Sequence, residues 1–344
     1  NGAILALCHN RFNEDSFRMS GETRTGRDLI SATRKYAKED KAKSWWYTLS
    51  TFGLWAACSL LAAILPTWPT QTAAAIVAGM IFVRAFILYH DHVHGALLSR
   101  SKNAKLLFSL HGLYQMTPRT VWKETHNYHH AHTAKIAGSH IGSYMMVTTR
   151  MWNMMTPMQK LKYRLSRHPL TILFGVFTVF VLGMLVSSLV RDPKKNWDSF
   201  ASLFLHISLA TAVPYFFGWN AYFFGIFLPL AVTCAMGAYL FYAQHNFPDV
   251  HIVERKDWEY SRAALESSSF MDMSPIMHWF TGNIGYHHIH HLNPSIPFYR
   301  LPDVMKDMPE TQNPIRVRLT FKSMLECFRL KLWDPKLGKM VGYP

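Results

Sequence analysis

The chain has 344 residues, of which 49% are hydrophobic and 17% charged. This composition favours a protein embedded in a membrane over a pair of soluble domains. The formal net charge of +15 does not by itself indicate a nucleic-acid partner, because the basic residues gather in segments that set the orientation of a membrane chain. The four cysteines are far apart, which argues against a disulfide framework and against a thiolate metal site.

Five apolar segments follow one another along the chain, each about 20 residues long, the length that crosses a hydrocarbon core of roughly 30 Å as a helix. They are residues 45–66, 71–89, 169–190, 200–217 and 220–243. Nine Lys or Arg residues precede position 45, the stretch 95–168 is basic, and the links 66–70 and 218–220 carry no charge. The positive-inside rule therefore puts the termini and the middle region in the cytosol and both links outside.

Five crossings cannot leave the middle region and the region after residue 243 on the same side. The link 191–195 is basic and would face outside if the third segment crossed. We therefore predict that residues 169–190 form a re-entrant or interfacial hairpin, which leaves four true crossings. Arg84 lies inside the second segment and is expected to reach the cytosolic boundary or to pair internally, because a charge facing lipid is costly.

Histidine is concentrated in three short strings and one isolated position. Eleven of the 19 histidines lie in the strings His90–His94, His126–His132 and His287–His291, and His245 follows the last apolar segment. Residues i, i+3 and i+4 of a helix lie on one side. Each string therefore presents a compact set of ring nitrogens and one spare histidine, and the spare ones are His92, His132 and His288.

If these strings converge, their eight or nine neutral imidazoles exceed what one ion accepts, which predicts two transition-metal ions. Imidazole alone suits iron, zinc, copper or nickel, and the ligand count does not choose among them. The fixed helical spacing argues against a low-complexity tract that buffers metal. The other histidines are expected to be packed or hydrogen-bonded, namely His9, His111, His140, His168, His206, His251 and His278.

The order of the motifs resembles that of the membrane fatty acid desaturase family. It runs His-x-x-x-His, His-x-x-His-His, a lone His after a membrane hairpin, and a second His-x-x-His-His. Residues 281–292, TGNIGYHHIHHL, followed by Pro294 and Pro297, are similar to the bacterial acyl-lipid branch. The resemblance covers about residues 45–310, most of the chain.

This resemblance implies a non-haem di-iron oxidoreductase that uses O2 and two external electrons to insert a cis double bond into a membrane-lipid acyl chain. The implied iron ligands are His90, His94, His126, His129, His130, His245, His287, His290 and His291. Asp91 is expected either to orient a ligand imidazole or to be solvated on the helix surface. Where the acyl-CoA branch has an Asn that holds a metal-bound water, this chain has Phe241. Gln244 and Asn246 are the candidates to replace that Asn.

The partners follow from the same resemblance. No His-Pro-Gly-Gly haem string occurs in the sequence, so an external donor is implied, either ferredoxin or a cytochrome b5-like protein. The nearest alternative function is a hydroxylase or ketolase on the same scaffold. A metal transporter is a remote alternative, because histidines that line a path across the bilayer would not all gather at one membrane face.

We therefore predict an all-α integral membrane protein with four transmembrane helices, a re-entrant or interfacial hairpin, and a cytosolic helical cap that carries the histidine strings. Three regions are expected: a cytosolic N-terminal segment (1–44), the membrane domain with the di-iron site (45–310) and a cytosolic C-terminal segment (311–344). Met19 offers a candidate native start, which would leave residues 1–18 outside the native protein. The expected location is the bacterial plasma membrane, with the site facing the cytosol.

Overall fold

The structure is a computed structural model that describes residues 24–136, 141, 143–252 and 257–344. Met19 and residues 1–18 lie outside the described residues. The described chain is mostly helical, with little sheet. Its α-helices are α1 (Gly26–Thr33), α2 (Lys41–Ile64), α3 (Trp68–His94), α4 (Lys102–Tyr114), α5 (Arg119–Ala131), α6 (Thr149–Met154), α7 (Pro157–Ser166), α8 (Pro169–Leu173), α9 (Ser187–Arg191), α10 (Trp197–Phe217), α11 (Trp219–Tyr222), α12 (Leu228–Ala243), α13 (Tyr260–Glu266), α14 (Pro275–Phe280), α15 (His287–Leu292), α16 (Leu301–Asp307) and α17 (Phe321–Arg329).

The described residues also form 3₁₀ turns, π-helical stretches and short strands. The 3₁₀ turns are η1 (Arg34–Tyr36), η5 (Phe298–Arg300) and η6 (Pro309–Thr311), and the π-helical stretches are η2 (Val176–Val186) and η3 (Phe223–Phe227). The strands are β1 (Phe270–Asp272), β2 (Arg316–Arg318), β3 (Leu332–Asp334) and β4 (Lys339–Val341).

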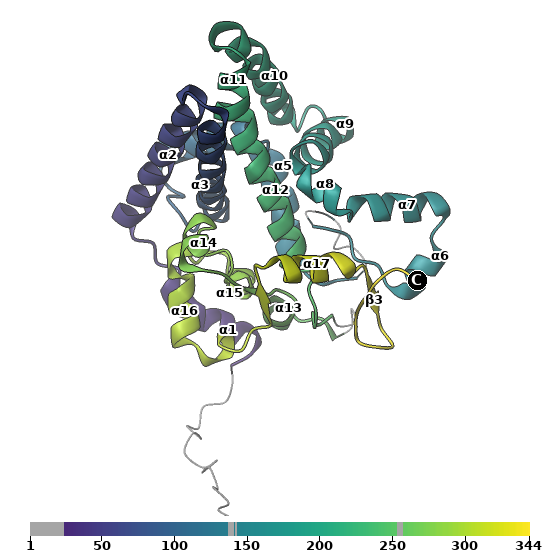
Figure 1. The fold of residues 1–344 in the computed structure, drawn as a ribbon. Helices are drawn as coiled ribbons and strands as arrows, with labels where there is room; N and C mark the ends of the chain where they lie inside the picture. Colours follow the sequence, from purple (N-terminus) through teal and green to yellow (C-terminus); the bar gives the residue numbers. More distant parts are fainter. Residues whose placement is uncertain (1–23, 137–140, 142, 253–256) are drawn as a thin grey trace, which may run out of the picture.

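Within the described residues, four helices are long and apolar enough to cross a membrane, which confirms the predicted fold class. They are α2, α3, α10 and the continuous helix made of α11, η3 and α12. Figure 1 shows the α2–α3 link and the α10–α11 turn at one end of the molecule and the short helices of the cap at the other. Large apolar side chains on the outer faces are exposed, for example Leu60 and Phe204, and a lipid environment would cover them.

The third apolar segment does not form a spanning helix. It is divided into α8, η2 and α9, and its longest helical stretch, Val176–Arg191, is shorter than the four spans. This segment packs against α12 and α10 and lies on their far side from α2 and α3 in Figure 1. The segment is therefore an apolar helical stretch at the edge of the bundle, shorter than the four spans, and its re-entrant or interfacial placement in the membrane stays a prediction.

Helix α3 carries the first histidine string at its cap end. Pro69 lies in its first turn, where the missing N–H is not needed by the helix. Gly95 ends the helix directly after His94, with φ +82° and ψ 6°, and its N–H bonds to the carbonyl oxygens of Asp91 and His92. A left-handed residue at this position favours glycine, and the stop fixes where the string meets the cap.

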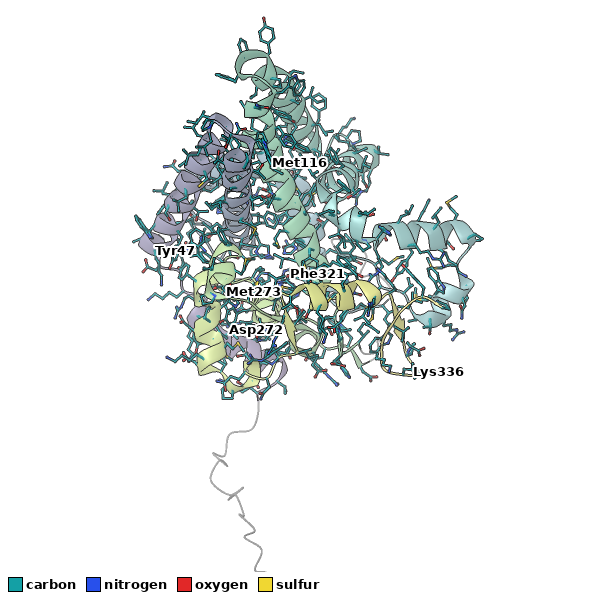
Figure 2. The ribbon with its side chains drawn as sticks, in the orientation of Figure 1. Tyr47, Met116, Asp272, Met273, Phe321 and Lys336 are labelled. Atoms are coloured by element: carbon teal, nitrogen blue, oxygen red, sulfur yellow. The ribbon has the colours of Figure 1, made fainter. Side chains whose placement is uncertain are left out.

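Arg84 lies in α3, and its buried side chain is paired inside the protein. Its Nε donates to Thr51 Oγ1 at 3.2 Å, and its Nη1 donates to the Trp279 carbonyl oxygen at 2.6 Å. The guanidinium also lies 5.4 Å from the ring centroid of Tyr47, which Figure 2 shows at the cap end of α2. Neutral donors, acceptors and aromatic rings thus hold this charge, and the contacts join α2, α3 and α14.

The cap is built from short helices and two small sheets. β1 pairs in parallel with β2, with Phe270 opposite Arg316, and β3 pairs antiparallel with β4, with Leu332 opposite Val341. Figure 2 places Met273, next to β1, and Phe321, at the start of α17, close beneath the spanning helices. The β1–β2 pairing therefore connects the C-terminal region to the part of the cap that carries the third histidine string.

Candidate metal centre

The nine histidines of the predicted ligand set lie together in two groups. The five-histidine group consists of His90, His94, His126, His130 and His290, and the four-histidine group consists of His129, His245, His287 and His291. Within each group, the candidate ligand nitrogens lie within 4.8 Å of one another. Each group could therefore hold a metal ion.

Helices α5 and α15 each contribute to both groups. In α5, His126 and His130 join the five-histidine group while His129 joins the other. On a helix, residue i+4 lies about 40° to one side of residue i, and residue i+3 lies about 60° to the other side. The i+3 histidine therefore reaches the neighbouring group. Helix α15 repeats the pattern with the groups exchanged, because His287 and His291 join the four-histidine group and His290 joins the five-histidine group.

In the four-histidine group, the Nε2 atoms face one another. His245 Nε2 lies 3.1 Å from His129 Nε2 and 3.0 Å from His287 Nε2. His245 Nδ1 donates a hydrogen bond to the Ser267 carbonyl oxygen at 3.1 Å. A neutral imidazole carries a single N–H, so His245 Nε2 holds a lone pair that points into the group. Converging lone pairs repel one another unless a cation lies between them, and imidazole nitrogens are donors that suit transition-metal ions.

The five-histidine group has the same arrangement. His90 Nε2 lies 2.8 Å from His126 Nε2, and His130 Nε2 lies 3.1 Å from His290 Nε2. His90 Nδ1 lies 3.1 Å from Asp91 Oδ1 and donates to this carboxylate, which leaves its Nε2 as a lone pair. The His130–His290 contact joins the second and third strings, so these strings are not separated by the bilayer.

Burial keeps the cap imidazoles in the neutral form that binds metal. Loss of solvation lowers the pKa of His245 to about 4. Burial, with neighbouring histidines as a second cause, also lowers pKa values well below the usual range for His126, His129, His130, His287, His290 and His291. The imidazoles of both groups are therefore neutral and can bind a cation through their ring nitrogens.

The spare histidine of each string points away from the groups, as the helical spacing predicts. His92 Nδ1 bonds to the Leu97 carbonyl oxygen at 2.9 Å. His132 Nδ1 bonds to the Tyr128 carbonyl oxygen at 2.9 Å, and His288 Nε2 bonds to that of Thr311 at 3.1 Å. Of the histidines outside the strings, His206 is hydrogen-bonded to the Tyr114 carbonyl oxygen, and His9 and His140 lie outside the described residues.

Asp91 is buried beside the five-histidine group rather than solvated on the helix surface. One carboxylate oxygen accepts from His90, and the other accepts from the Phe298 backbone N–H at 2.7 Å. A carboxylate in this position fixes the orientation and tautomer of the imidazole. Asp91 also connects α3 to η5, which lies far away in the sequence.

Gln244 and Asn246 have other partners. Gln244 Nε2 donates to the Ile284 carbonyl oxygen at 2.9 Å. Asn246 accepts from the buried Arg167 and donates to the Cys327 carbonyl oxygen at 2.8 Å. Phe241, at the position of the family asparagine, places its ring centroid 5.7 Å from that of His126. These residues therefore shape the surroundings of the groups through packing and backbone contacts.

Three residues that the sequence did not single out support the four-histidine group. Thr133 Oγ1 donates to the His129 carbonyl oxygen at 2.9 Å and lies 3.1 Å from His291 Nδ1. Tyr260 Oη donates to the His291 carbonyl oxygen at 2.6 Å, and Ser267 accepts from His245. Each contact joins residues that are distant along the chain or uses the backbone, so no local pattern in the sequence marks it.

An apolar pocket of about 270 Å³ adjoins the five-histidine group. It lies between α5, η2 and α12, and Trp122, His126, Val179, Met184 and Phe241 are among its lining residues. Small-molecule sites are typically concave and mostly apolar, with a few polar groups. The pocket thus offers an apolar ligand a place next to candidate metal ligands.

A family model described as "Fatty acid desaturase" matches residues 66–321, a stretch that contains both histidine groups. The chain belongs to the fatty acid desaturase family. Membership in this family implies an oxidoreductase that acts on lipid acyl chains in a membrane. The resemblance read from the histidine strings is thereby confirmed.

Individual members of the fatty acid desaturase family align over most of the chain. A "Fatty acid desaturase" of Bacillus subtilis is 29% identical over 327 residues, covering 92% of this chain and 90% of that protein. An "sn-1 acyl-lipid omega-3 desaturase (ferredoxin)" of Synechocystis is 25% identical over 276 residues, covering 74% of this chain and 72% of that protein. A "Delta(8)-fatty-acid desaturase 2" of Arabidopsis thaliana is 25% identical over 359 residues, covering 96% and 76%.

Proposed function

We propose that the protein is an O2-dependent desaturase that inserts a cis double bond into the acyl chain of a membrane lipid, with two iron ions held by the nine histidines. The observation that carries this proposal is the pair of all-imidazole groups beside an apolar pocket, in a member of the fatty acid desaturase family. The buried, neutral nitrogens fit two divalent ions. The bacterial plasma membrane is the proposed location, with the cap in the cytosol.

When bound, the iron pair would supply the oxidising chemistry that an unactivated C–H bond requires. Removing two hydrogens releases two electrons, whereas reducing O2 to two waters consumes four, so two electrons come from outside. The residues of this chain hold and orient the site. Asp91 fixes the His90 ring, and the rings of Trp122 and Phe241, 5.6 Å apart, both pack against the His126 ring.

The substrate assignment depends on the apolar pocket. Val179 and Met184 of η2 face Trp122 of α5 across it, and apolar walls favour an acyl chain over a polar ligand. The name of the Synechocystis relative states an acyl-lipid substrate and ferredoxin. By similarity we propose an intact lipid as substrate and a ferredoxin or a cytochrome b5-like protein as electron donor.

A hydroxylase or ketolase is the second candidate, because the same oxidant can leave an oxygen on the carbon instead of removing a second hydrogen. The two outcomes differ in the product. A transporter is disfavoured, because both histidine groups lie at the cap end of the spanning helices and do not line a path between the two ends.

The test is gas chromatography of fatty acid methyl esters from cells that express the chain. The His129→Ala variant removes one member of the four-histidine group. His132→Ala is the matched control, because this spare histidine of the same string contacts Tyr128, through a hydrogen bond to its carbonyl oxygen and ring stacking, and belongs to neither group. We expect a new unsaturated ester with the unchanged protein and with His132→Ala, and none with His129→Ala.

Iron analysis of the purified proteins accompanies this test. We expect close to two iron ions per chain in the unchanged protein and in His132→Ala, and fewer in His129→Ala. A hydroxylated ester would replace the desaturase assignment with the hydroxylase. Equal amounts of unsaturated ester from all three proteins would contradict the proposed role of the four-histidine group in catalysis.

A further inference from the structure

A second, smaller cavity lies between α3 and α12, which pack against each other. Its volume is about 30 Å³, whereas that of the apolar pocket is about 270 Å³. Val83 of α3 and Leu240 of α12 are among its lining residues, and none of the lining residues is exposed. Val83 precedes His90 by about two helical turns, so the cavity lies on the membrane side of the histidine groups.

The size of this cavity limits its contents to a very small molecule. A water molecule needs roughly 10–15 Å³ of such space, so the cavity has room for about two atoms of that size. About one turn before Val83, the two spans are in contact, because a Cβ atom added at Gly79 would lie 2.7 Å from Val232 Cβ. The cavity therefore fits a diatomic molecule and is too short for an acyl chain.

The walls of the cavity are almost entirely apolar. Gln244 is among the lining residues, but its Nε2 donates to the Ile284 carbonyl oxygen at 2.9 Å. The Nε2 atoms of His90 and His126 face each other at 2.8 Å within the five-histidine group. A buried water typically needs two to four polar partners, and apolar cavities stay dry and bind apolar molecules instead. The chemistry of the walls therefore selects a small apolar molecule over water.

The cavity adjoins both histidine groups. His90 and His126 of its lining belong to the five-histidine group, and His287 belongs to the four-histidine group. His126 and Phe241 also line the apolar pocket, so the cavity and the pocket share these two residues. A molecule in the cavity therefore lies beside both groups and close to the place proposed for the acyl chain.

We propose that this cavity is a binding site for O2, which it holds beside the two histidine groups before the reaction. The inference rests on the proposed function, which requires O2 as co-substrate. O2 is a small apolar molecule that dissolves better in hydrocarbon than in water, so a dry apolar cavity favours it. A cavity separate from the apolar pocket lets O2 and the acyl chain be bound at the same time.

The first test uses xenon, an apolar atom that enters dry cavities and is located by its anomalous X-ray scattering. Crystals of the full chain are pressurised with xenon in the absence of lipid substrate. Val83→Ile adds one methylene group to the cavity wall, and Val77→Ile makes the same change at an exposed residue of the same helix. We expect xenon in the cavity of the unchanged protein and of Val77→Ile, and none in Val83→Ile.

The second test measures formation of the unsaturated ester at a series of O2 concentrations. Val83→Ile should raise the KM for O2 several-fold, while kcat at saturating O2 and the iron content stay close to those of the unchanged protein. Val77→Ile should match the unchanged protein. Leu240→Phe fills the cavity from α12 and replaces Val83→Ile if that variant has a lower melting temperature or still binds xenon.

Three results would overturn the inference. The first is a cavity without xenon in the unchanged protein, and the second is a water or an acyl chain in the cavity that xenon does not displace. The third is an unchanged KM for O2 in a variant that has lost the xenon atom.

Failure of the inference can be told apart from failure of the proposed function, because xenon binding requires neither iron nor a product. A protein that forms the unsaturated ester but binds no xenon contradicts the cavity site alone. A protein that binds xenon but consumes no O2 contradicts the proposed function, and the assignment of O2 as the ligand fails with it.

Discussion

Asp91 is a single side chain on which two distant parts of the molecule meet. It accepts one hydrogen bond from His90 and one from the backbone of Phe298, and it is buried. A buried carboxylate is costly unless its oxygens are hydrogen-bonded. The bonds it makes here orient an imidazole of the five-histidine group.

Replacement of Asp91 by Asn keeps the size of the side chain but removes the negative charge that orients His90. We expect the affinity for iron to fall about 10- to 100-fold, the usual effect of losing a partner behind a metal ligand. Titration with a competing chelator, followed by iron analysis, measures this. His92→Gln, at the neighbouring residue that points away from the groups, should leave the affinity unchanged, and equal loss in both variants would contradict the role of Asp91.

His111 makes stability depend on pH. It lies in α4, outside the four spanning helices, and burial lowers its pKa to about 3. The unfolded chain takes up a proton below pH 6.5 and the folded chain does not, so stability is lost as pH falls through that value. His111→Phe should abolish a loss of about 2 kcal/mol in unfolding free energy between pH 7 and pH 5. Thermal unfolding of both proteins in detergent at pH 7 and pH 5 checks this. Between pH 7 and pH 8, His111 should cause no difference in stability.

The two central spans depend on a glycine for their close approach. At Gly79 of α3, a Cβ atom would lie 2.7 Å from the Pro229 carbonyl oxygen and from Val232 Cβ of α12. At Gly53 of α2, nothing lies within 4 Å of the corresponding position. The same residue type thus has a packing role in one span and none in the other.

Alanine at these two positions should therefore have opposite effects. Gly79→Ala should lower the unfolding free energy by about 1–3 kcal/mol through overpacking. Gly53→Ala should leave it unchanged or raise it by up to about 1 kcal/mol through helix propensity. Melting temperatures in the same detergent give the comparison. A stable Gly79→Ala protein would show that α12 can shift away from α3.

What the sequence predicts well here is local or periodic. The apolar segments predict the four spans. The helical spacing of the three strings, together with the lone His245, selects the nine histidines that lie together in the two groups, while His92, His132 and His288 lie apart from them. It does not show that i+3 members such as His129 and His290 serve the opposite group from their neighbours. Spacing within one string separates the i+3 histidine from its neighbours, but which group it joins depends on how α5 and α15 are placed in the fold, which tertiary packing sets. Supporting contacts such as Thr133 to His291 span 158 positions and leave no local trace.

The molecule as a whole has two chemically different ends. The α2–α3 link and the α10–α11 turn lie at one end, and the cap with both histidine groups lies at the other (Figure 1). Figure 2 shows Lys336 at the margin of the cap, far from both links. The distribution of basic residues predicts that the cap is in the cytosol.

Single cysteines test this orientation, in a chain whose four cysteines are replaced by alanine. Thr70 and Lys336 are both exposed, one in the first turn of α3 and one beyond β3. A maleimide that cannot cross membranes should label Thr70→Cys in intact cells and Lys336→Cys only after lysis. The reverse pattern would place the histidine groups outside the cell.

The shared use of α5 and α15 has a thermodynamic consequence for assembly of the centre. An ion in one group immobilises both helices and so pre-arranges nitrogens of the other group, because each helix bears members of both. Binding of the second ion then costs less conformational entropy than binding of the first. Binding of the two ions would be cooperative, so chains that hold a single ion would be scarce at every intermediate metal concentration. Release of one ion would likewise promote release of the other.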